Sequence, residues 1–509
     1  MSTAPDASDS RGSSRTAATA IPAPYQGNDK LLFGIILGVL TFWLFAQTTL
    51  NIAPDMQKDL GLDASLMNIA VAITALFSGI FIVVIGGLAD RVGRLMIVRI
   101  GFILSIVGSL LIALAPAGSL ASAFLLVGRA LQGLSGACIM PASLALVKTF
   151  WDGPARQRAV SLWSIGSWGG SGVCSLFGGL VAQNFGWRDI FFASIAAAVL
   201  GLVMIQGAPE SRAETRGDYK FDLSGVVTFM VAMIALQIVV TQANKLGWTS
   251  PLVVALIVAA LVFGSLFFWI ESHASNAFVD FKLFRNSTYT GATVSNFLLN
   301  AVAGTLLVSL QLVQLGGNVT AQQAGMLTLG YAVAIIAFIR VGEKLLQRYG
   351  SRKPMIWGCL ITGLSILMLL PSNLLLTEYR ILAIASYTLF GVGLAFYATP
   401  STDAALSSLP AAQAGSGAGI YKMASSLGAA FGVAISAAIF TALSANAQSI
   451  NWLEGVVTFQ GRQDNLSIRE AAMIALSFNV FMVVVAIVSI MLTVPKAGMP
   501  VQGSAAARK

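Results

Sequence analysis

The chain has 509 residues, of which 56% are hydrophobic and only 10% charged, and its mean hydropathy is +0.81. This composition excludes a soluble globular domain and predicts a polytopic membrane protein. A net charge of +9 does not indicate a nucleic-acid partner, because the basic residues are spread through short loops. Cys138, Cys174 and Cys359 lie in apolar runs without paired spacing, which argues against disulfides or a metal site.

Apolar runs long enough to cross a bilayer set the predicted architecture. A spanning helix needs about 20 apolar residues. We therefore predict an all-α integral membrane fold of fourteen helices, with two six-helix pseudo-repeats and two central helices. The predicted spans are 31–53, 66–89, 95–115, 120–147, 158–183, 187–207, 223–243, 251–271, 290–316, 321–343, 354–371, 377–400, 414–445 and 470–495.

These spans predict five parts of the chain. Residues 1–29 lack an apolar region and are expected to form a disordered cytoplasmic tail. An N-terminal six-helix bundle (30–207) precedes a linker with two inserted helices (208–289), a C-terminal six-helix bundle (290–495) and a second cytoplasmic tail (496–509). Most of the 30 Lys and Arg residues fall in the tails and in the loops on the same side as the tails. The positive-inside rule therefore predicts a plasma-membrane protein with both termini in the cytoplasm.

The two halves of the chain echo each other weakly. Arg348 and Gly350, between spans ten and eleven, follow Arg91 and Gly93, between spans two and three, by the same number of residues. In the same way Pro400, placed after span twelve, answers Pro141 in span four, whereas Gln347 replaces the aspartate expected from the first half. Repeats of this kind build many transporters, with the site at the interface of the halves.

A charged loop, Gly86-Gly-Leu-Ala-Asp-Arg-Val-Gly-Arg94, joins spans two and three. Gly93 permits a tight turn, and Asp90 can cap the next helix or pair with Arg91 or Arg94. The loop resembles the loop motif of the major facilitator superfamily. That resemblance implies a gate at the cytoplasmic end, and the gating residues expected from it are Gly86, Asp90, Arg91, Gly93, Arg94 and Arg348. The alternative is a solvated loop that only sets topology.

Further segments resemble the fourteen-helix drug:proton antiporters of this superfamily, and among them the NorB-type multidrug (quinolone) exporters. These segments are 125–137, 177–179, 186–191, 289–293, 340–344 and 399–403, and the resemblance covers about residues 28–497. Two departures stand out. Cys174 and Ser175 replace the Gly-Pro pair of the antiporter motif in span five, and Ala46 stands where many relatives carry an aspartate, five residues before Asn51.

The resemblance implies a proton-coupled multidrug efflux transporter that exports hydrophobic cationic or zwitterionic compounds by alternating access. The expected partners are drug molecules, protons and membrane lipid, and we expect a monomer without catalytic activity, cofactor or metal. Alternatives are a transporter of an endogenous small solute and a transporter-derived membrane sensor, although the tails are short for an output domain. A membrane-embedded enzyme needs converging His, Asp or Glu side chains, and His273 is the only histidine.

Candidate site residues follow from charge and polarity within the spans. Arg129 in span four is expected to take part in proton coupling, with Asp403 and Glu343 as candidate acids. The alternatives are a structural hydrogen bond for the arginine and boundary charges for the acids. Lys422 can snorkel, pair with Asp403 or sense a substrate charge. The predicted packing motif is Gly170, Gly178 and Gly179, and the predicted substrate cavity is Gln47, Asn51, Trp163, Trp168, Asn296, Asn300, Gln311 and Lys422.

Overall fold

The computed structural model describes residues 25–213, 222–274, 279, 281–374, 376–444, 457–461 and 465–496, and within these ranges the regular structure is entirely helical. Thirteen helices are long and apolar enough to cross a membrane, or fourteen when the bent pair Gly153–Cys174 and Leu176–Asn184 counts as one span. This agrees with the predicted helical membrane fold. Residues 1–24 of the tail predicted at 1–29, residues 497–509 of the tail predicted at 496–509, and most of the segment 446–469 between the last two predicted spans lie outside the described residues.

The first half of the bundle runs from α1 to α8. Two of its spans contain a π-helical turn, η1 and η2, which are places where a helix widens and which occur often at functional sites. The elements are α1 (Asp29–Leu40), η1 (Thr41–Ala46), α2 (Gln47–Leu60), α3 (Ala64–Val92), α4 (Arg94–Ala113), α5 (Ala121–Phe150), α6 (Gly153–Ser164), η2 (Ile165–Gly169), α7 (Gly170–Asn184) and α8 (Trp187–Met204).

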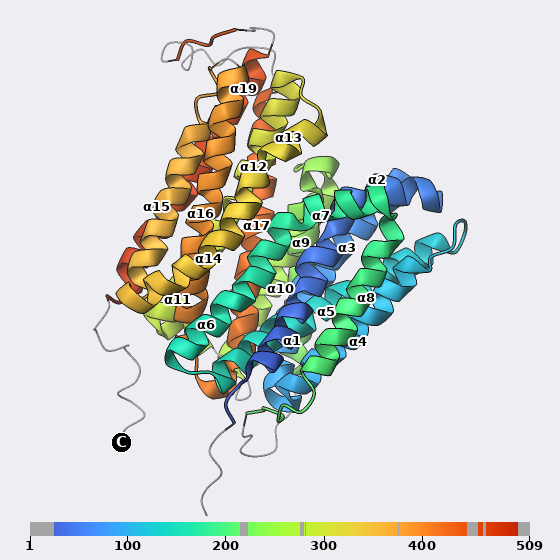
Figure 1. The fold of residues 1–509 in the computed structure, drawn as a ribbon, viewed down its shortest axis with the longest axis vertical. Coiled ribbons are helices and arrows are strands. Elements are labelled where there is room, and N and C mark those ends of the chain that lie inside the picture. Colours follow the sequence, from blue (N-terminus) through green and yellow to red (C-terminus); the bar gives the residue numbers. More distant parts are fainter. Residues whose placement is uncertain are drawn as a thin grey trace, which may run out of the picture.

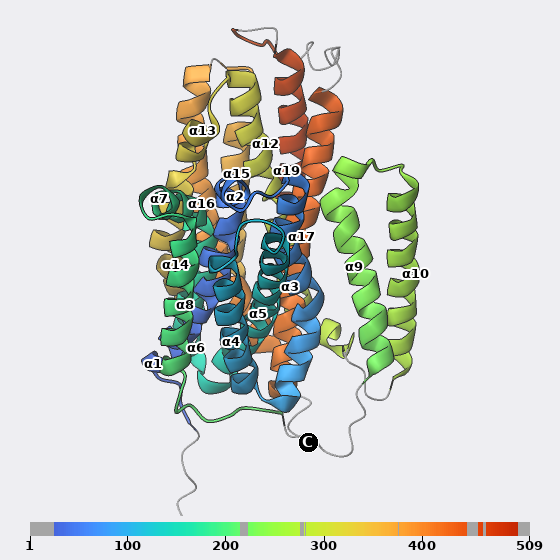
Figure 2. The same cartoon turned by 90° about the vertical axis from the view of Figure 1, so that its right-hand side faces the viewer.

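The second half runs from α11 to α19. Its elements are η3 (Phe281–Arg285), α11 (Ser287–Ala301), α12 (Gly304–Gln311), η4 (Leu312–Gly316), α13 (Ala321–Leu327), α14 (Leu329–Tyr349), α15 (Arg352–Leu369), α16 (Leu376–Ser408), η5 (Ala411–Gln413), α17 (Ala414–Ser444) and α19 (Leu466–Thr493). Between the halves, α9 (Leu223–Leu246) and α10 (Pro251–His273) form a hairpin at the side of the bundle, where α9 packs on α3 and α17 (Figure 2).

Two helices extend six or more residues past their predicted ends. The tenth predicted span ended at 343, but α14 continues to Tyr349, and the twelfth ended at 400, but α16 continues to Ser408. Pro400 and Asp403 therefore lie inside α16 rather than at its end or beyond it. A helix in a membrane protein can continue past proline because neighbouring helices satisfy the freed backbone groups.

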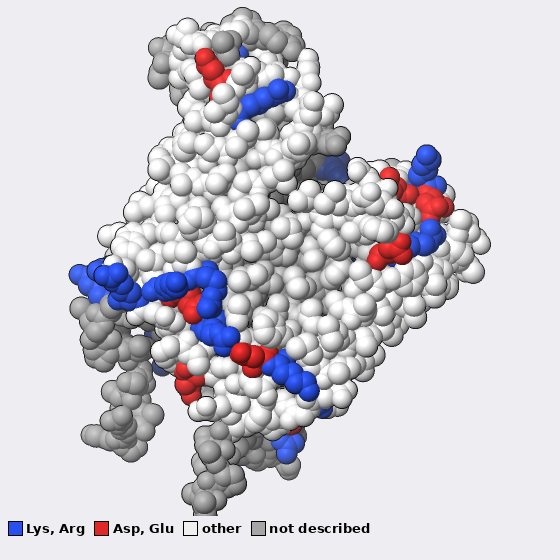
Figure 3. Space-filling view, viewed as in Figure 1, with Lys and Arg blue, Asp and Glu red and all other residues white. Residues whose placement is uncertain are grey.

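The two halves meet at one end of the molecule and diverge at the other (Figure 1). We call the end where α1 begins and α19 ends the terminal end, and the opposite end the distal end. On the face shown in Figure 3, Lys, Arg, Asp and Glu lie in groups near these two ends, and the surface between them carries none. Such an uncharged band is what the hydrocarbon core of a bilayer requires.

Glycines allow the same close helix contact in both halves. A Cβ added to Gly108 on α4 would lie 2.8 Å from the carbonyl oxygen of Gly128 on α5, and a Cβ on Gly358 of α15 would lie 2.7 Å from that of Gly393 on α16. In membranes, helix association depends on such small residues, because lipid supplies no hydrophobic drive between helices.

We therefore expect Gly358→Ala to separate α15 from α16 and to destabilise the fold by about 1 to 3 kcal/mol, the usual cost of overpacking. Thermal unfolding in detergent, followed by tryptophan fluorescence, checks this. Gly264→Ala on α10 is the matched control, because nothing lies within 4 Å of its added Cβ. Equal melting temperatures for the two variants would contradict the packing account.

Candidate functional site

The halves are joined at the terminal end by one buried carboxylate. Asp90, near the end of α3, is 4% exposed, and its two oxygens accept the backbone N–H groups of Gly415 at 2.8 and 2.9 Å and of Ser416 at 2.9 Å. These N–H groups belong to the first turn of α17, where helix donors are unsatisfied and the dipole is positive. The first half thus caps a helix of the second. Gly86 makes room for this contact, since its added Cβ would lie 2.5 Å from the Gly415 carbonyl oxygen.

Arg94 completes this cluster. Its guanidinium donates to Asp90 Oδ1 at 2.7 and 2.9 Å and to the carbonyl oxygen of Ala411, in the second half, at 2.5 Å. It also donates to the hydroxyls of Thr149 at 2.6 Å and Ser211 at 3.2 Å. An arginine with five N–H donors can hold several acceptors at once, so Arg94 fixes Asp90 in the orientation that α17 requires.

Of the two roles predicted for Asp90, pairing with Arg94 matches the structure and capping of the next helix does not. The carboxylate that caps α4 is Glu210, which accepts the N–H groups of Leu95 at 2.8 Å and Met96 at 2.9 Å. Gly93 makes the turn with φ of +139°, and a Cβ there would lie 2.6 Å from the Glu210 carboxyl carbon. Sequence analysis missed Glu210 because it lies more than a hundred residues along the chain from the helix it caps.

The other two predicted gating residues lie differently. Arg91 follows Asp90 in the last turn of α3 and is half-buried. Arg348 is exposed near the end of α14, with its guanidinium carbon 5.2 Å from the ring centroid of Tyr349, in its own half.

A second contact between the halves at this end is an ion pair. Asp403 on α16 is 3% exposed and accepts from Arg156 Nε on α6 at 2.9 Å. Close by, the Lys148 ammonium lies 3.4 Å from the carbonyl oxygen of Ser407. Glu343, by contrast, pairs with Arg340 of its own helix. Sequence analysis missed this pair because Arg156 and Asp403 lie far apart along the chain.

Arg129 is held within the first half by neutral acceptors. The residue is 2% exposed, and its guanidinium donates to the carbonyl oxygens of Ala46 at 2.8 Å and Ala70 at 3.0 Å. It also donates to Thr49 Oγ1 at 3.0 Å and Gln132 Oε1 at 2.8 Å. Ala46 ends the π-helical turn η1. The arginine therefore holds the backbone of this π-helical turn.

Lys422 lies on α17 at the interface of the halves. It is 4% exposed, and its ammonium nitrogen lies 5.4 Å from the ring centroid of Trp43 and 5.1 Å from that of Trp163. Both tryptophans belong to the first half, on η1 and α6. Burial is inconsistent with snorkelling to the surface, and Asp403 pairs with Arg156 rather than with this lysine. Sequence analysis missed Trp43, although it stands only three residues before Ala46.

The remaining predicted cavity residues are partly used in packing. The Asn296 side chain donates to the Tyr421 carbonyl oxygen at 2.9 Å, joining α11 to α17, and Asn300 donates to Asn296. Three other predicted cavity residues are half-buried: Gln47, Trp168 and Gln311. The side chain of Asn51 lies outside the described residues.

Two of the three predicted packing glycines lie at close helix contacts, and the third does not. An added Cβ on Gly170 would lie 3.3 Å from Trp43 Cβ on η1, and one on Gly178 would lie 2.2 Å from Thr48 Cγ2 on α2. Gly179 has nothing within 4 Å of its added Cβ and lines a pocket of about 350 Å³ between α7 and α14. Two of the three therefore let α7 approach the first span closely.

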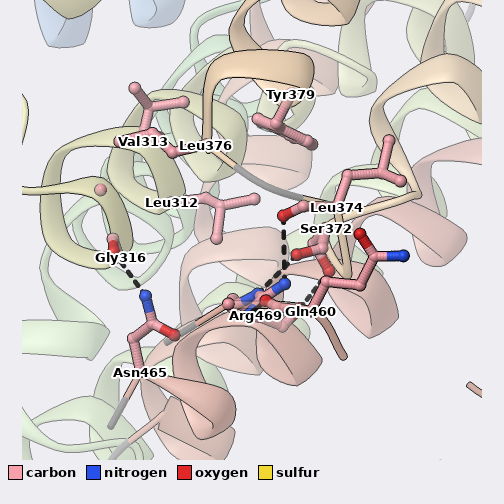
Figure 4. Close-up of a pocket in the computed structure, with 12 residues that line it drawn as sticks. Leu312, Val313, Gly316, Ser372, Leu374, Leu376, Tyr379, Gln460, Asn465 and Arg469 are labelled. Atoms are coloured by element: carbon pink, nitrogen blue, oxygen red, sulfur yellow. Dashed lines mark hydrogen bonds between the residues drawn. The ribbon is translucent and has the colours of Figure 1, made fainter. Parts of the chain in front are cut away.

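An arginine-containing pocket of about 220 Å³ lies at the distal end of the second half (Figure 4). Its Arg469 donates to the carbonyl oxygens of Ser372 at 2.6 Å, Gln460 at 2.8 Å and Leu374 at 3.1 Å. Asn465 donates to the Gly316 carbonyl oxygen at 2.5 Å. These bonds fasten the loops to α19, so we read the pocket as structural. Within the described part of the chain there is no group of three or more His, Cys, Asp or Glu that could hold a metal.

Two helical halves locked together at one end and separated at the other define a membrane transporter. A family model described as Major Facilitator Superfamily matches residues 32–309 and 287–502. The chain belongs to this superfamily.

Relatives agree with that assignment. The chain is 47% identical over 476 residues to the quinolone resistance protein NorB of Staphylococcus aureus strain MRSA252, covering 93% of this chain and 97% of the relative. The NorB protein of strain COL gives the same figures. Among solved structures, the proton:xylose symporter XylE bound to a bromodeoxyglucose aligns with a TM-score of 0.61, covering 92% of this chain and 96% of that chain at 16% sequence identity. At this identity the likeness concerns the fold.

The first functional prediction concerns the gate. We expect Asp90→Asn to weaken the charge-assisted bonds to α17 and Arg94 by about 1 to 2 kcal/mol, which shifts the population of the closed terminal end about tenfold. Double electron–electron resonance measures the distance between the halves at this end. The spin labels are placed on Ala155→Cys and Lys344→Cys in a background without the native cysteines.

Asp152→Asn is the matched control, because this carboxylate is exposed at the same end of the molecule. The distance distribution is expected to move to longer values for Asp90→Asn and to stay unchanged for Asp152→Asn. An unchanged distribution in both variants would show that Asp90 does not hold the gate.

Proposed function

We propose that this protein is a proton-coupled exporter of hydrophobic cationic or zwitterionic drugs, quinolones among them, with the terminal end in the cytoplasm. The observation that carries the proposal is closure at one end alone. The Asp90 cap on α17 and the Arg156–Asp403 pair join the halves at the terminal end, while the halves diverge at the distal end (Figure 1). The similarity to a relative named for quinolone resistance supports the choice of substrate.

Alternating access follows if these same contacts break when the distal end closes. The backbone N–H groups of α17 donate to the ionised carboxylate of Asp90, and Arg156 forms an ion pair with the ionised carboxylate of Asp403. Protonation of Asp403 or Asp90 would therefore weaken closure of the terminal end and favour the inward-open state. A proton drives export only if proton and drug stabilise different states, because a ligand with equal affinity for both shifts nothing.

We propose Asp403 as the first candidate for the coupling acid and Glu343 as the second. Asp403 ranks first because its ion pair crosses between the halves, so a change in its charge acts directly on the gate. Glu343 is equally buried, but its partner Arg340 lies on the same helix. For Arg129, the neutral hydrogen-bond network supports a role in holding η1 against α3 and α5, and through η1 in positioning Trp43.

Purified protein in liposomes with an imposed pH gradient tests the function. We expect wild type to move norfloxacin against its gradient when protons flow the other way. Asp403→Asn is expected to lose at least tenfold of this gradient-driven flux while still exchanging labelled for unlabelled drug, because binding sites survive when coupling is lost. Asp152→Asn serves as the control with unchanged flux.

Three results would count against parts of the proposal. If no drug moves, an endogenous solute becomes the better substrate class. If wild-type flux ignores the pH gradient, proton coupling is rejected. If Asp403→Asn and Glu343→Gln both keep gradient-driven flux, neither acid couples the proton.

A further inference from the structure

The surroundings of Lys422 contain donors without an acceptor. The Nε1–H of Trp43 is buried and has no hydrogen-bond partner among the described residues. The Lys422 ammonium contacts the faces of Trp43 and Trp163. Trp163 itself is satisfied, since its Nε1 donates to Ser143 Oγ at 2.9 Å. An ammonium and an indole N–H on opposite sides of the interface thus both lack an acceptor in the part of the chain that the structure describes.

The acids that could neutralise Lys422 are engaged elsewhere. Within the described residues, Asp90 pairs with Arg94, Asp403 with Arg156 and Glu343 with Arg340. A buried ammonium without a counter-charge is costly, and such residues in membrane proteins mark substrate or ion pathways. The cation–π contacts relieve part of this cost but leave the three N–H donors of the ammonium unused.

The depth of Lys422 suits a substrate site. It lies seven residues beyond Gly415 on α17, which is about 10 Å along a helix that rises about 1.5 Å per residue. Lys422 is therefore inside the terminal gate and toward the middle of the bilayer. Trp43 is half-buried, so part of its indole is accessible although its Nε1–H is not.

We propose that Lys422 and Trp43 Nε1 form a subsite for the carboxylate of an aromatic drug, with the drug's ring system against the indoles of Trp43 and Trp163. This inference rests on the proposed drug export and names the chemical class: aromatic acids and zwitterions whose carboxylate is attached to the ring. Many quinolones, norfloxacin among them, carry such a carboxylate and, elsewhere on the ring system, a basic amine. The carboxylate supplies both the missing acceptor and the missing charge, and it leaves the indole faces for stacking.

Such a ligand also bridges the two halves. Lys422 belongs to the second half and Trp43 to the first, so their separation changes when the halves rock. The carboxylate can therefore contact both donors in one conformation only, which gives the drug the differential affinity that coupling requires.

A paired substrate isolates the subsite. Norfloxacin and its methyl ester share the ring and the amine but differ in the carboxylate. We expect wild type in liposomes to transport the acid with at least tenfold higher kcat/KM than the ester. In Lys422→Met, a neutral side chain of similar length, the ratio is expected to fall to near one with ester transport kept within twofold. Trp43→Phe, which keeps an aromatic face but removes the N–H together with the pyrrole ring, should give an intermediate ratio, and Lys422→Arg should retain it.

Lys344→Met, on the surface, and Trp269→Phe, on the exposed face of α10 at 64% exposure, are the matched controls and should keep the wild-type ratio. If wild type carries neither compound, the proposed function fails, and the subsite with it. If wild type carries both and Lys422→Met keeps the preference for the acid, the subsite is refuted while drug export stands. Equal loss of acid and ester transport in Lys422→Met also refutes it, because Lys422 then serves folding or coupling rather than carboxylate recognition.

Discussion

Closure of the terminal end depends on how one carboxylate is satisfied away from water. Asp90 is buried between α3 and α17, and a buried charge requires partners on every side. It finds them in Arg94 of its own half and in the unsatisfied first-turn N–H groups of α17 in the other half. Because the N–H groups of α17 move away when the halves separate, the free energy of opening includes the loss of their bonds to Asp90. Gly86 and Gly415 matter for the same reason, since only at glycines do the two backbones come close enough for the bonds to form.

The two buried cations, Arg129 and Lys422, are stabilised by neutral groups rather than by carboxylates among the described residues. Arg129 is satisfied by backbone carbonyls and neutral side chains, which fits a residue that fixes helix geometry. Lys422 is satisfied only by aromatic faces. Neither buried cation therefore has a resident acid among the described residues around it, and the candidate coupling acids lie at the gate instead.

Several of these features could be predicted from the sequence because they are local. The spans follow from apolar length, and the turn at Gly93 follows from its spacing within the loop. The contacts that matter most are not local: Asp90 meets Gly415 from the far half of the chain, Glu210 caps a helix it follows by more than a hundred residues, and Arg156 meets Asp403. No pattern in a single sequence reports such pairs. Trp43 is a further example, since a tryptophan in an apolar run shows no sign of its partner until α17 is packed against it.

The central claim is that the two ends of the molecule open in alternation. The most direct measurement follows both ends under the same conditions, with spin labels on Ala155→Cys and Lys344→Cys for the terminal end and on Lys58→Cys and Thr377→Cys for the distal end. As the pH is changed and norfloxacin is added, the two distances are predicted to change in opposite directions. Distances that lengthen or shorten together, or that ignore both proton and drug, would contradict the account.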